Sequence, residues 1–116
     1  MAIPNLFSQE NQSVYAETIE QITHDSLQMS QQGIIASLEG MKIRVDRSHL
    51  LEQSDFPVLM VIGKKDPALN YHSLIEQAKK KGVESVVFDD GHMSHIETKQ
   101  ELIEVLSKWI AKTVKK

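Results

Sequence analysis

The apolar run at residues 58–62, Val-Leu-Met-Val-Ile, places the strongest limit on how this chain can fold. Pro57 precedes the run and Gly63 closes it, so it has the length of a strand rather than that of a helix. Side chains alternate between the two faces of a strand, and here both faces are apolar. Such a run is typical of a parallel strand buried between two layers of helices.

The rest of the second half alternates helix and strand. Residues 71–81 are predicted to form a helix with Gly82 as its C′ residue, because a positive φ is cheap only for glycine. Residues 83–88 are predicted to form a second strand, and residues 98–113 a last helix. Strand–helix–strand–helix is a βαβα unit, whose strands run parallel with a right-handed crossover. The predicted fold class is therefore α/β.

Two parallel strands rarely form a sheet of their own. Each predicted strand leaves one edge unpaired, and an unpaired edge is a template for pairing with another chain. We therefore expect either that another chain supplies the rest of the sheet or that two copies pair edge to edge. The isolated chain is expected to be a dimer or a larger assembly.

The first half of the chain has a helical pattern with no strand in it. Ser8 is a predicted N-cap of a helix that begins at Gln9, and Gly33 is expected to break or bend that helix. Asp46 is predicted to be the N-cap of a further short turn. The apolar residues form two stripes at steps of roughly three to four, namely Val14, Tyr15, Ile19, Ile22 and Met29, then Ile34, Ile35, Leu38 and Met41. The apolar faces of these amphipathic helices require a surface to cover.

Charge and composition exclude several classes of protein. The 13 basic and 16 acidic residues give a net charge of −3, which argues against a nucleic-acid binder held by a broad basic face. The absence of cysteine excludes disulfides, thiolate metal sites and a cysteine nucleophile, and it favours a reducing, cytoplasmic location. No apolar run approaches the roughly 20 residues that span a bilayer. The first residues lack the basic and long apolar regions of a signal peptide.

Polar residues gather where the two predicted strands end. Asp66 follows the first strand, and His92 follows the second. In open α/β sheets, ligands and catalytic groups collect at the carboxyl ends of parallel strands. A carboxylate beside an imidazole fixes the tautomer of the ring and stabilises the imidazolium while histidine acts as a general base. Asp66 and His92 are therefore the candidate catalytic residues. The alternatives are a plain turn residue for Asp66, because Asp-Pro is common in turns, and a surface histidine for His92.

Two motifs in this order carry a resemblance to a known family. They are Val-Leu-Met-Val-Ile-Gly-Lys-Lys-Asp-Pro at residues 58–67 and Val-Val-Phe-Asp-Asp-Gly-His-Met-Ser-His-Ile-Glu at residues 86–97. Together they resemble the C-terminal part of an α/β-hydrolase. In that family the acid follows the penultimate core strand and the histidine follows the last. The resemblance therefore implies that Asp66 is the acid of a catalytic triad and that His92 is its base.

The helical first part, notably Gly-Ile-Ile-Ala-Ser-Leu-Glu-Gly-Met-Lys at residues 33–42 and Arg-Val-Asp-Arg at residues 44–47, resembles the cap, or lid, of the same family. On this basis the chain divides into a helical cap segment at residues 1–54 and the C-terminal βαβα part of the hydrolase core at residues 55–116. One departure is large, because the family's nucleophile lies upstream on a Gly-x-Ser-x-Gly elbow and this sequence contains no such motif. The implied activity is hydrolysis of a carboxylic ester or a related acyl bond by a Ser-His-Asp enzyme. This chain carries the acid and the base of that enzyme but no nucleophile.

Two consequences and one competing hypothesis follow. Without a nucleophile and oxyanion donors, the chain alone is expected to be inactive or nearly so as an esterase. The chemistry needs neither a metal nor an organic cofactor, and the partner implied for the complete enzyme is a small ester-like substrate. The competing hypothesis is a non-catalytic association module that dimerises, or pairs with the missing N-terminal half, through the exposed sheet edge. A weaker third is a degenerate gene product with no selected activity.

Three residues near His92 have other interpretations. His92, His95 and Glu97 superficially suggest a metal site, but they straddle a loop-to-helix boundary, and zinc requires three or four ligands in a fixed geometry. Glu97 is assigned instead to the first turn of the last helix, where the helix dipole favours an acid. Ser94 lies two residues from His92 without an elbow, and it is not expected to act as the nucleophile.

Overall fold

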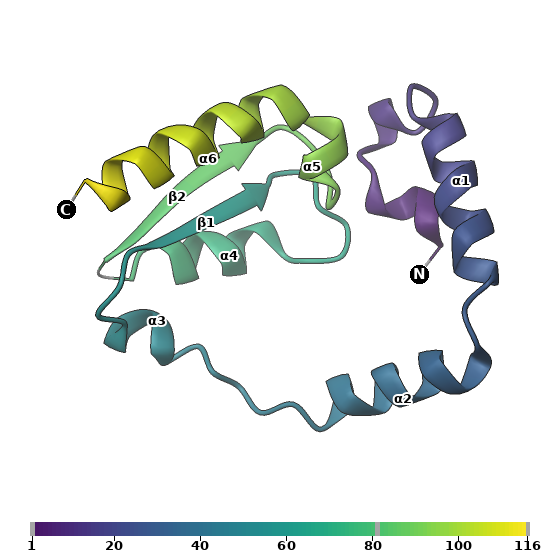
Figure 1. Ribbon diagram of the computed structural model, residues 1–116, viewed down its shortest axis with the longest axis horizontal. Coiled ribbons are helices and arrows are strands. Elements are labelled where there is room, and N and C mark those ends of the chain that lie inside the picture. The colour runs from purple at the N-terminus through teal and green to yellow at the C-terminus, as the bar shows by residue number, and fades with distance from the viewer. Residues whose placement is uncertain (1, 81, 116) are drawn as a thin grey trace.

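The parallel sheet predicted for the second half is present. The structure is a computed structural model that describes residues 2–80 and 82–115. Strands β1 (Val58–Gly63) and β2 (Val83–Phe88) lie side by side in parallel (Figure 1). Val58 is opposite Val83, and Gly63 is opposite Phe88. Both strands confirm the prediction, and the mixture of helices with parallel strands makes the fold α/β.

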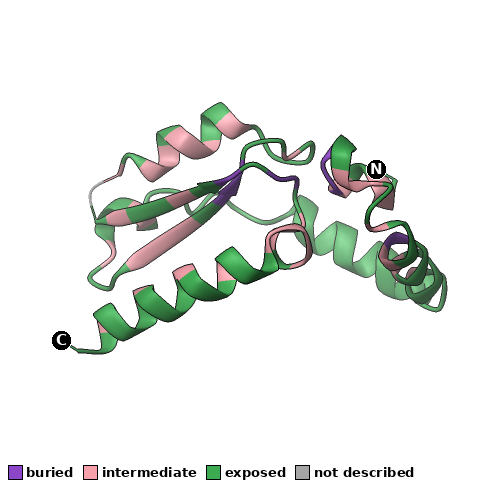
Figure 2. Cartoon of the chain, turned by 90° about the horizontal axis from the view of Figure 1, so that it is seen from above, coloured by how far each residue is buried: buried purple, intermediate pink, exposed green. Residues whose placement is uncertain are grey.

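Two helices flank the sheet. Helices α4 (Tyr71–Ala78) and α6 (Lys99–Val114) lie on opposite sides of it (Figure 2), which explains why β1 is apolar on both faces. Helix α6 agrees with its prediction within one residue at each end. Helix α4 ends at Ala78, earlier than predicted, and the predicted last residue, Lys81, lies outside the described residues.

Gly82 is not the C′ residue of α4, because the helix ends before it. Its φ of +85° nevertheless requires glycine. The residue belongs to a turn in which the Val83 N–H donates to the Lys80 carbonyl at 3.1 Å. The sequence therefore predicts the conformation of Gly82 correctly and its place in the connection wrongly.

The buried core is small and, apart from Ile19, lies at the carboxyl ends of the strands and in the N-terminal segment beside them. Its apolar members are Phe7, Ile19, Ile62 and Phe88. Figure 2 shows the buried residues where the strands end and in the N-terminal segment beside them. Ile62 and Phe88 come from the sheet, whereas Phe7 comes from the start of the chain. The best-packed part of the molecule therefore joins the two halves at the strand ends.

The first helix begins later than the sequence predicts. Residues Ile3–Leu6 and Gln9–Asn11 form two short 3₁₀ turns, η1 and η2, and helix α1 extends over Ala16–Leu27. The Ser8 side chain makes no capping hydrogen bond, so its prediction as a helix cap is wrong. The Ser8 N–H donates to Glu97 Oε1 at 2.8 Å, so residue 8 is held by a residue 89 positions away in the sequence.

Helix α2 (Gln31–Lys42) and the short α3 (Leu50–Gln53) complete the first half. Gly33 does not break a helix, because it lies inside α2. The chain turns just before it, where the Ser30 side chain accepts from the Gly33 N–H at 3.0 Å. Asp46 caps the short turn that leads into α3, as the sequence predicts. Its Oδ1 accepts from the N–H of Ser48 at 2.8 Å, and that turn leads into the helix.

All residues from 27 to 50 are exposed, and helix α2 stands away from the sheet (Figure 1). The apolar stripe of α2 therefore covers no other part of the described chain. Among the described residues, no helix is both long enough and apolar enough to cross a membrane. The predicted division of the chain between residues 54 and 55 remains a prediction.

Candidate active site

Asp66 and His92 meet at the carboxyl ends of the two strands. His92 Nδ1 lies 2.8 Å from Asp66 Oδ2, although the residues are 26 positions apart. The Asp66 side chain is 5% exposed, whereas that of His92 is 38% exposed. The acid is therefore shielded beneath a ring that faces solvent. The predicted placement of the pair is confirmed, and their catalytic roles remain a prediction.

The turn after β1 holds Asp66 in place. Asp66 Oδ1 accepts from the N–H of Ala68 at 2.7 Å and from that of Leu69 at 3.1 Å. Asp66 is thus the turn residue that its Asp-Pro sequence indicates, and it also contacts the histidine. One carboxylate oxygen serves the turn and the other is left for His92, so the turn orients the acid.

The same geometry assigns the tautomer of His92. An ionised carboxylate can only accept hydrogen bonds, so a neutral ring bonded to Asp66 must carry its proton on Nδ1. Nε2 is then unprotonated and available as a base. No described residue hydrogen-bonds to Nε2. This is the arrangement that a general base requires.

Two glycines allow the loops to approach. A Cβ on Gly63 would collide with the carbonyl oxygen of Gly91. A Cβ on Gly91 would lie 2.5 Å from the Ser8 nitrogen and 2.8 Å from the Leu6 oxygen. Both glycines therefore serve close packing, because Gly82 alone of the described glycines has a positive φ. Backbone contact between the two loops continues past the strands, where the Lys65 N–H donates to the Asp90 carbonyl at 2.8 Å.

Asp90 turns away from His92 into the interior. Its side chain is buried, and its Oδ2 accepts from the Thr98 hydroxyl at 2.5 Å. Thr98 stands at the start of α6, so this bond ties the loop after β2 to that helix. The loop that carries His92 is therefore fixed at its first residues.

A cation joins the N-terminal segment to both loops. Lys65 Nζ lies 2.9 Å from Glu10 Oε1 and 3.2 Å from Asp89 Oδ2. The hydrogen bond from Lys65 lowers the pKa of Glu10 from its usual value. The bonds to Glu10 and then Asp89 raise the pKa of Lys65. All three groups are accessible to solvent, so the contact is sensitive to salt.

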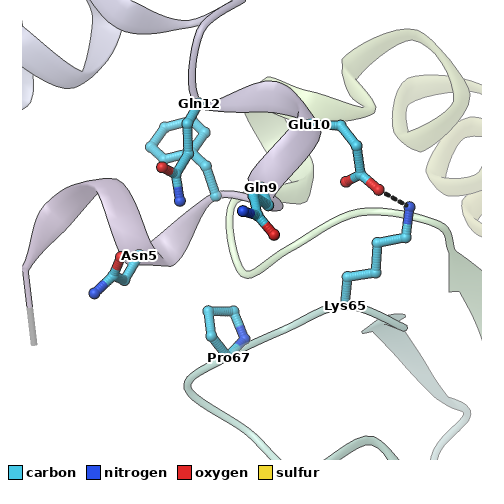
Figure 3. A pocket seen from close by; sticks show the side chains of 7 residues that line it. Asn5, Gln9, Glu10, Gln12, Lys65 and Pro67 are labelled. Carbon is cyan, nitrogen blue, oxygen red and sulfur yellow. Dashed lines mark hydrogen bonds and ion pairs between the residues drawn. The ribbon is translucent and has the colours of Figure 1, made fainter.

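An open hollow of about 690 Å³ lies beside this ion pair (Figure 3). It is lined by the polar residues Asn5, Gln9, Glu10, Gln12 and Lys65 and by the apolar residues Phe7 and Pro67. The N-terminal segment forms one side, and the loop after β1 forms the other (Figure 3). Neither Asp66 nor His92 lines the hollow, so it is a neighbour of the candidate pair rather than its substrate pocket.

The remaining candidates near His92 have other positions. His95 and Ser94 lie in the short helix α5 (Ser94–Glu97), and His95 is exposed. Within residues 2–80 and 82–115, no three His, Cys, Asp or Glu side chains are grouped to hold a metal ion. Glu97 does not lie in α6, and its carboxylate accepts hydrogen bonds from Ser8 and Gly91. Its assignment to the first turn of the last helix is therefore wrong.

Sequence reasoning missed the part of the site contributed by residues 6–11. The His92 N–H donates to the Leu6 carbonyl at 2.7 Å, and Ser8 and Asn11 both donate to Glu97. Backbone groups make most of these bonds, and every residue except proline carries them. The one available signal is the acid at position 97, close to a Gly-His turn whose N–H groups need partners.

No protein-family model and no curated protein matches this sequence.

Proposed function

We propose that this chain supplies the acid and the base of a serine-type α/β-hydrolase that cleaves carboxylic esters or related acyl bonds. The proposal rests on one observation, the 2.8 Å bond between Asp66 Oδ2 and His92 Nδ1 at the carboxyl ends of adjacent parallel strands. The shielded acid and the exposed ring support it. The order of the two motifs in the sequence supports the family.

In the proposed reaction, a serine from sequence outside this chain attacks the carbonyl carbon of the ester. His92 Nε2 takes the serine proton and then gives it to the departing alcohol. Water then attacks the acyl carbon and loses a proton to the same nitrogen, and the ring returns that proton to the serine oxygen as the bond to the acyl group breaks and the acid departs. Asp66 holds the ring with Nδ1–H directed at its own carboxylate and stabilises the imidazolium that forms twice in the cycle. These steps use no metal and no organic cofactor.

The first experiment compares the chain with two histidine variants on p-nitrophenyl acetate. We expect no turnover beyond that of exposed imidazoles, so His92→Ala and the matched control His95→Ala should behave alike. The physical reason is that a base without a nucleophile and oxyanion donors lacks the largest contributions to catalysis. Turnover that disappears in His92→Ala and survives in His95→Ala would contradict this expectation of inactivity.

The second experiment determines the DNA sequence upstream of the Met1 codon. We expect the same frame to encode further strands and a Gly-x-Ser-x-Gly elbow. In a protein extended in this way, His92→Ala should lower kcat by at least about 10⁴, the usual effect of losing a triad member. A frame without an elbow, or an extended protein indifferent to His92→Ala, would overturn the hydrolase proposal.

A second candidate function is association without catalysis. The observation that favours it is the apolar surface that the described chain leaves open. Both strands have an unpaired edge, and Val61 and Val87 on the sheet are exposed. Helices α2 and α6 add further exposed side chains, namely Ile34, Ile35, Leu38, Met41, Ile103, Leu106 and Ile110. This candidate predicts pairing with a second copy, or with a chain that completes the sheet.

A further inference from the structure

The carboxylate of Glu97 collects four N–H donors from two distant parts of the chain. Oε1 accepts from the backbone of Ser8 at 2.8 Å and from the side chain of Asn11 at 3.0 Å. Oε2 accepts from the backbone of Gly91 at 3.0 Å and from that of Met93 at 3.3 Å. One oxygen therefore binds the N-terminal segment, and the other binds the loop that carries His92.

The two donors on Oε2 flank the candidate base. Gly91 and Met93 are the residues on either side of His92, whose own N–H donates to the Leu6 carbonyl at 2.7 Å. All three consecutive N–H groups of this loop are thus bound by groups outside it. With the backbone fixed on both sides, the ring has little freedom except rotation of its side chain, which Asp66 limits.

The chemistry of the site explains why the residue is an acid. A carboxylate offers two oxygens that only accept, which matches two pairs of N–H donors. Glutamine offers one oxygen, and its NH₂ group would face one pair of donors without an acceptor. The helix dipole is a poor alternative explanation, because α5 is only four residues long.

We propose that Glu97 is a positioning residue for His92 and that residues 6–11 are part of the site. Glu97 bridges the N-terminal segment to the histidine loop, and this bridge sets the ring at hydrogen-bond distance from Asp66. Only the catalytic use of the positioned ring rests on the proposed function. The bridge and its effect on the ring are measurable without turnover.

The test compares Glu97→Gln with Glu101→Gln, an acid-to-amide change in the first turn of α6. Amide hydrogen exchange follows the N–H groups of Ser8, Gly91 and Met93, and ¹⁵N spectra of the neutral histidine report which ring nitrogen carries the proton. In Glu97→Gln we expect exchange of these amides to quicken by about tenfold or more, because hydrogen bonds to charged groups are the stronger ones. We also expect the His92 proton to move from Nδ1 toward Nε2. Glu101→Gln should change neither.

Asn11→Ala is a second, milder variant that tests the same contact if Glu97→Gln fails to fold. It removes one of the four donors and leaves the others, so we expect a smaller change of the same kind at Ser8 and at the His92 ring. Faster amide exchange with the proton retained on Nδ1, in either variant, would overturn the inference and leave Glu97 a structural residue. Unchanged amides would also overturn it. A wild-type His92 without the Nδ1 proton would overturn the proposed function and this inference together.

Discussion

At the residue scale, position 91 requires glycine because of the atoms around it and not because of its φ angle. The N-terminal segment passes so close that an added Cβ would lie 2.5 Å from the Ser8 nitrogen. The atoms that it would meet belong to backbone, which yields less easily than a flexible side chain. Any larger residue at this position must push residues 6–8 away from the histidine loop.

We therefore expect Gly91→Ala to destabilise the fold by about 1–3 kcal/mol, the usual cost of overpacking. Urea unfolding measures this loss. Gly40→Ala is the matched control, since a Cβ on Gly40, within α2, meets no atom within 4 Å. That substitution should leave stability unchanged or raise it, because alanine favours helix more than glycine does. Equal effects of the two substitutions would show that the close approach at Gly91 is not maintained in solution.

The sequence predicts Asp66 and His92 because each follows a recognisable strand. Once two strands are parallel and adjacent, their carboxyl ends coincide, and so do the residues just beyond them. Glu97 and Ser8 follow no comparable rule. They are 89 positions apart, and the bond between them uses a backbone N–H that has no signature in the sequence.

At the element scale, Lys65 fastens the turn η2 to the loops after both strands. The pKa of Glu10 is lowered in the folded state by its hydrogen bond to Lys65. A lowered carboxyl pKa adds stability at pH values above the unfolded pKa, and this contribution is lost as pH falls through the folded pKa. Lys65 has a raised pKa, so its contribution is present below the unfolded pKa and is lost at strongly alkaline pH.

Glu10→Gln should consequently lower the melting temperature at pH 7 by a few degrees at most, as expected for an exposed ion pair. The difference from wild type should shrink as pH falls below the usual carboxyl range, and it should shrink in high salt. Glu17→Gln in α1 is the control, because Glu17 has no ion pair among the described residues. A Glu10 effect that persists unchanged at acid pH would exclude the ionised contact as its origin.

The elements themselves were predictable to different degrees. Both strands and α6 follow from runs and periods that are long enough to fix their type. The start of α1 does not, because Ser8 has the chemistry of a helix cap but its side chain makes no capping hydrogen bond. A capping preference is worth only about 1 kcal/mol, which is too little to fix where a helix begins.

At the scale of the whole molecule, the chain is less compact than a typical monomer of the same size. It exposes 8786 Å², whereas a compact monomer of 13.1 kDa exposes about 6,400 Å². Its radius of gyration is 16.5 Å, against about 13 Å for a compact chain of this length. The excess surface is larger than the roughly 800 Å² that each partner buries in a standard protein interface.

We expect the chain to be a dimer or larger at micromolar concentration, because the strand edges and apolar faces then become covered. Light scattering should give a mass of at least twice 13.1 kDa. Val61→Lys places a charge on the exposed face of β1 and should lower this mass, whereas Glu20→Lys, a charge change in α1, should not. A monomeric wild type would count against the association candidate and against pairing of copies through the sheet.

The bond between Ser8 and Glu97 closes most of the polypeptide into a ring. Closing such a ring has an entropic cost that grows only with the logarithm of its length, so doubling a flexible loop adds about 0.6 kcal/mol. Residues 27–50, exposed throughout, are part of this closed loop and are distant in sequence from both Ser8 and Glu97. Residues inserted there would lengthen the chain without changing the contact between Asp66 and His92.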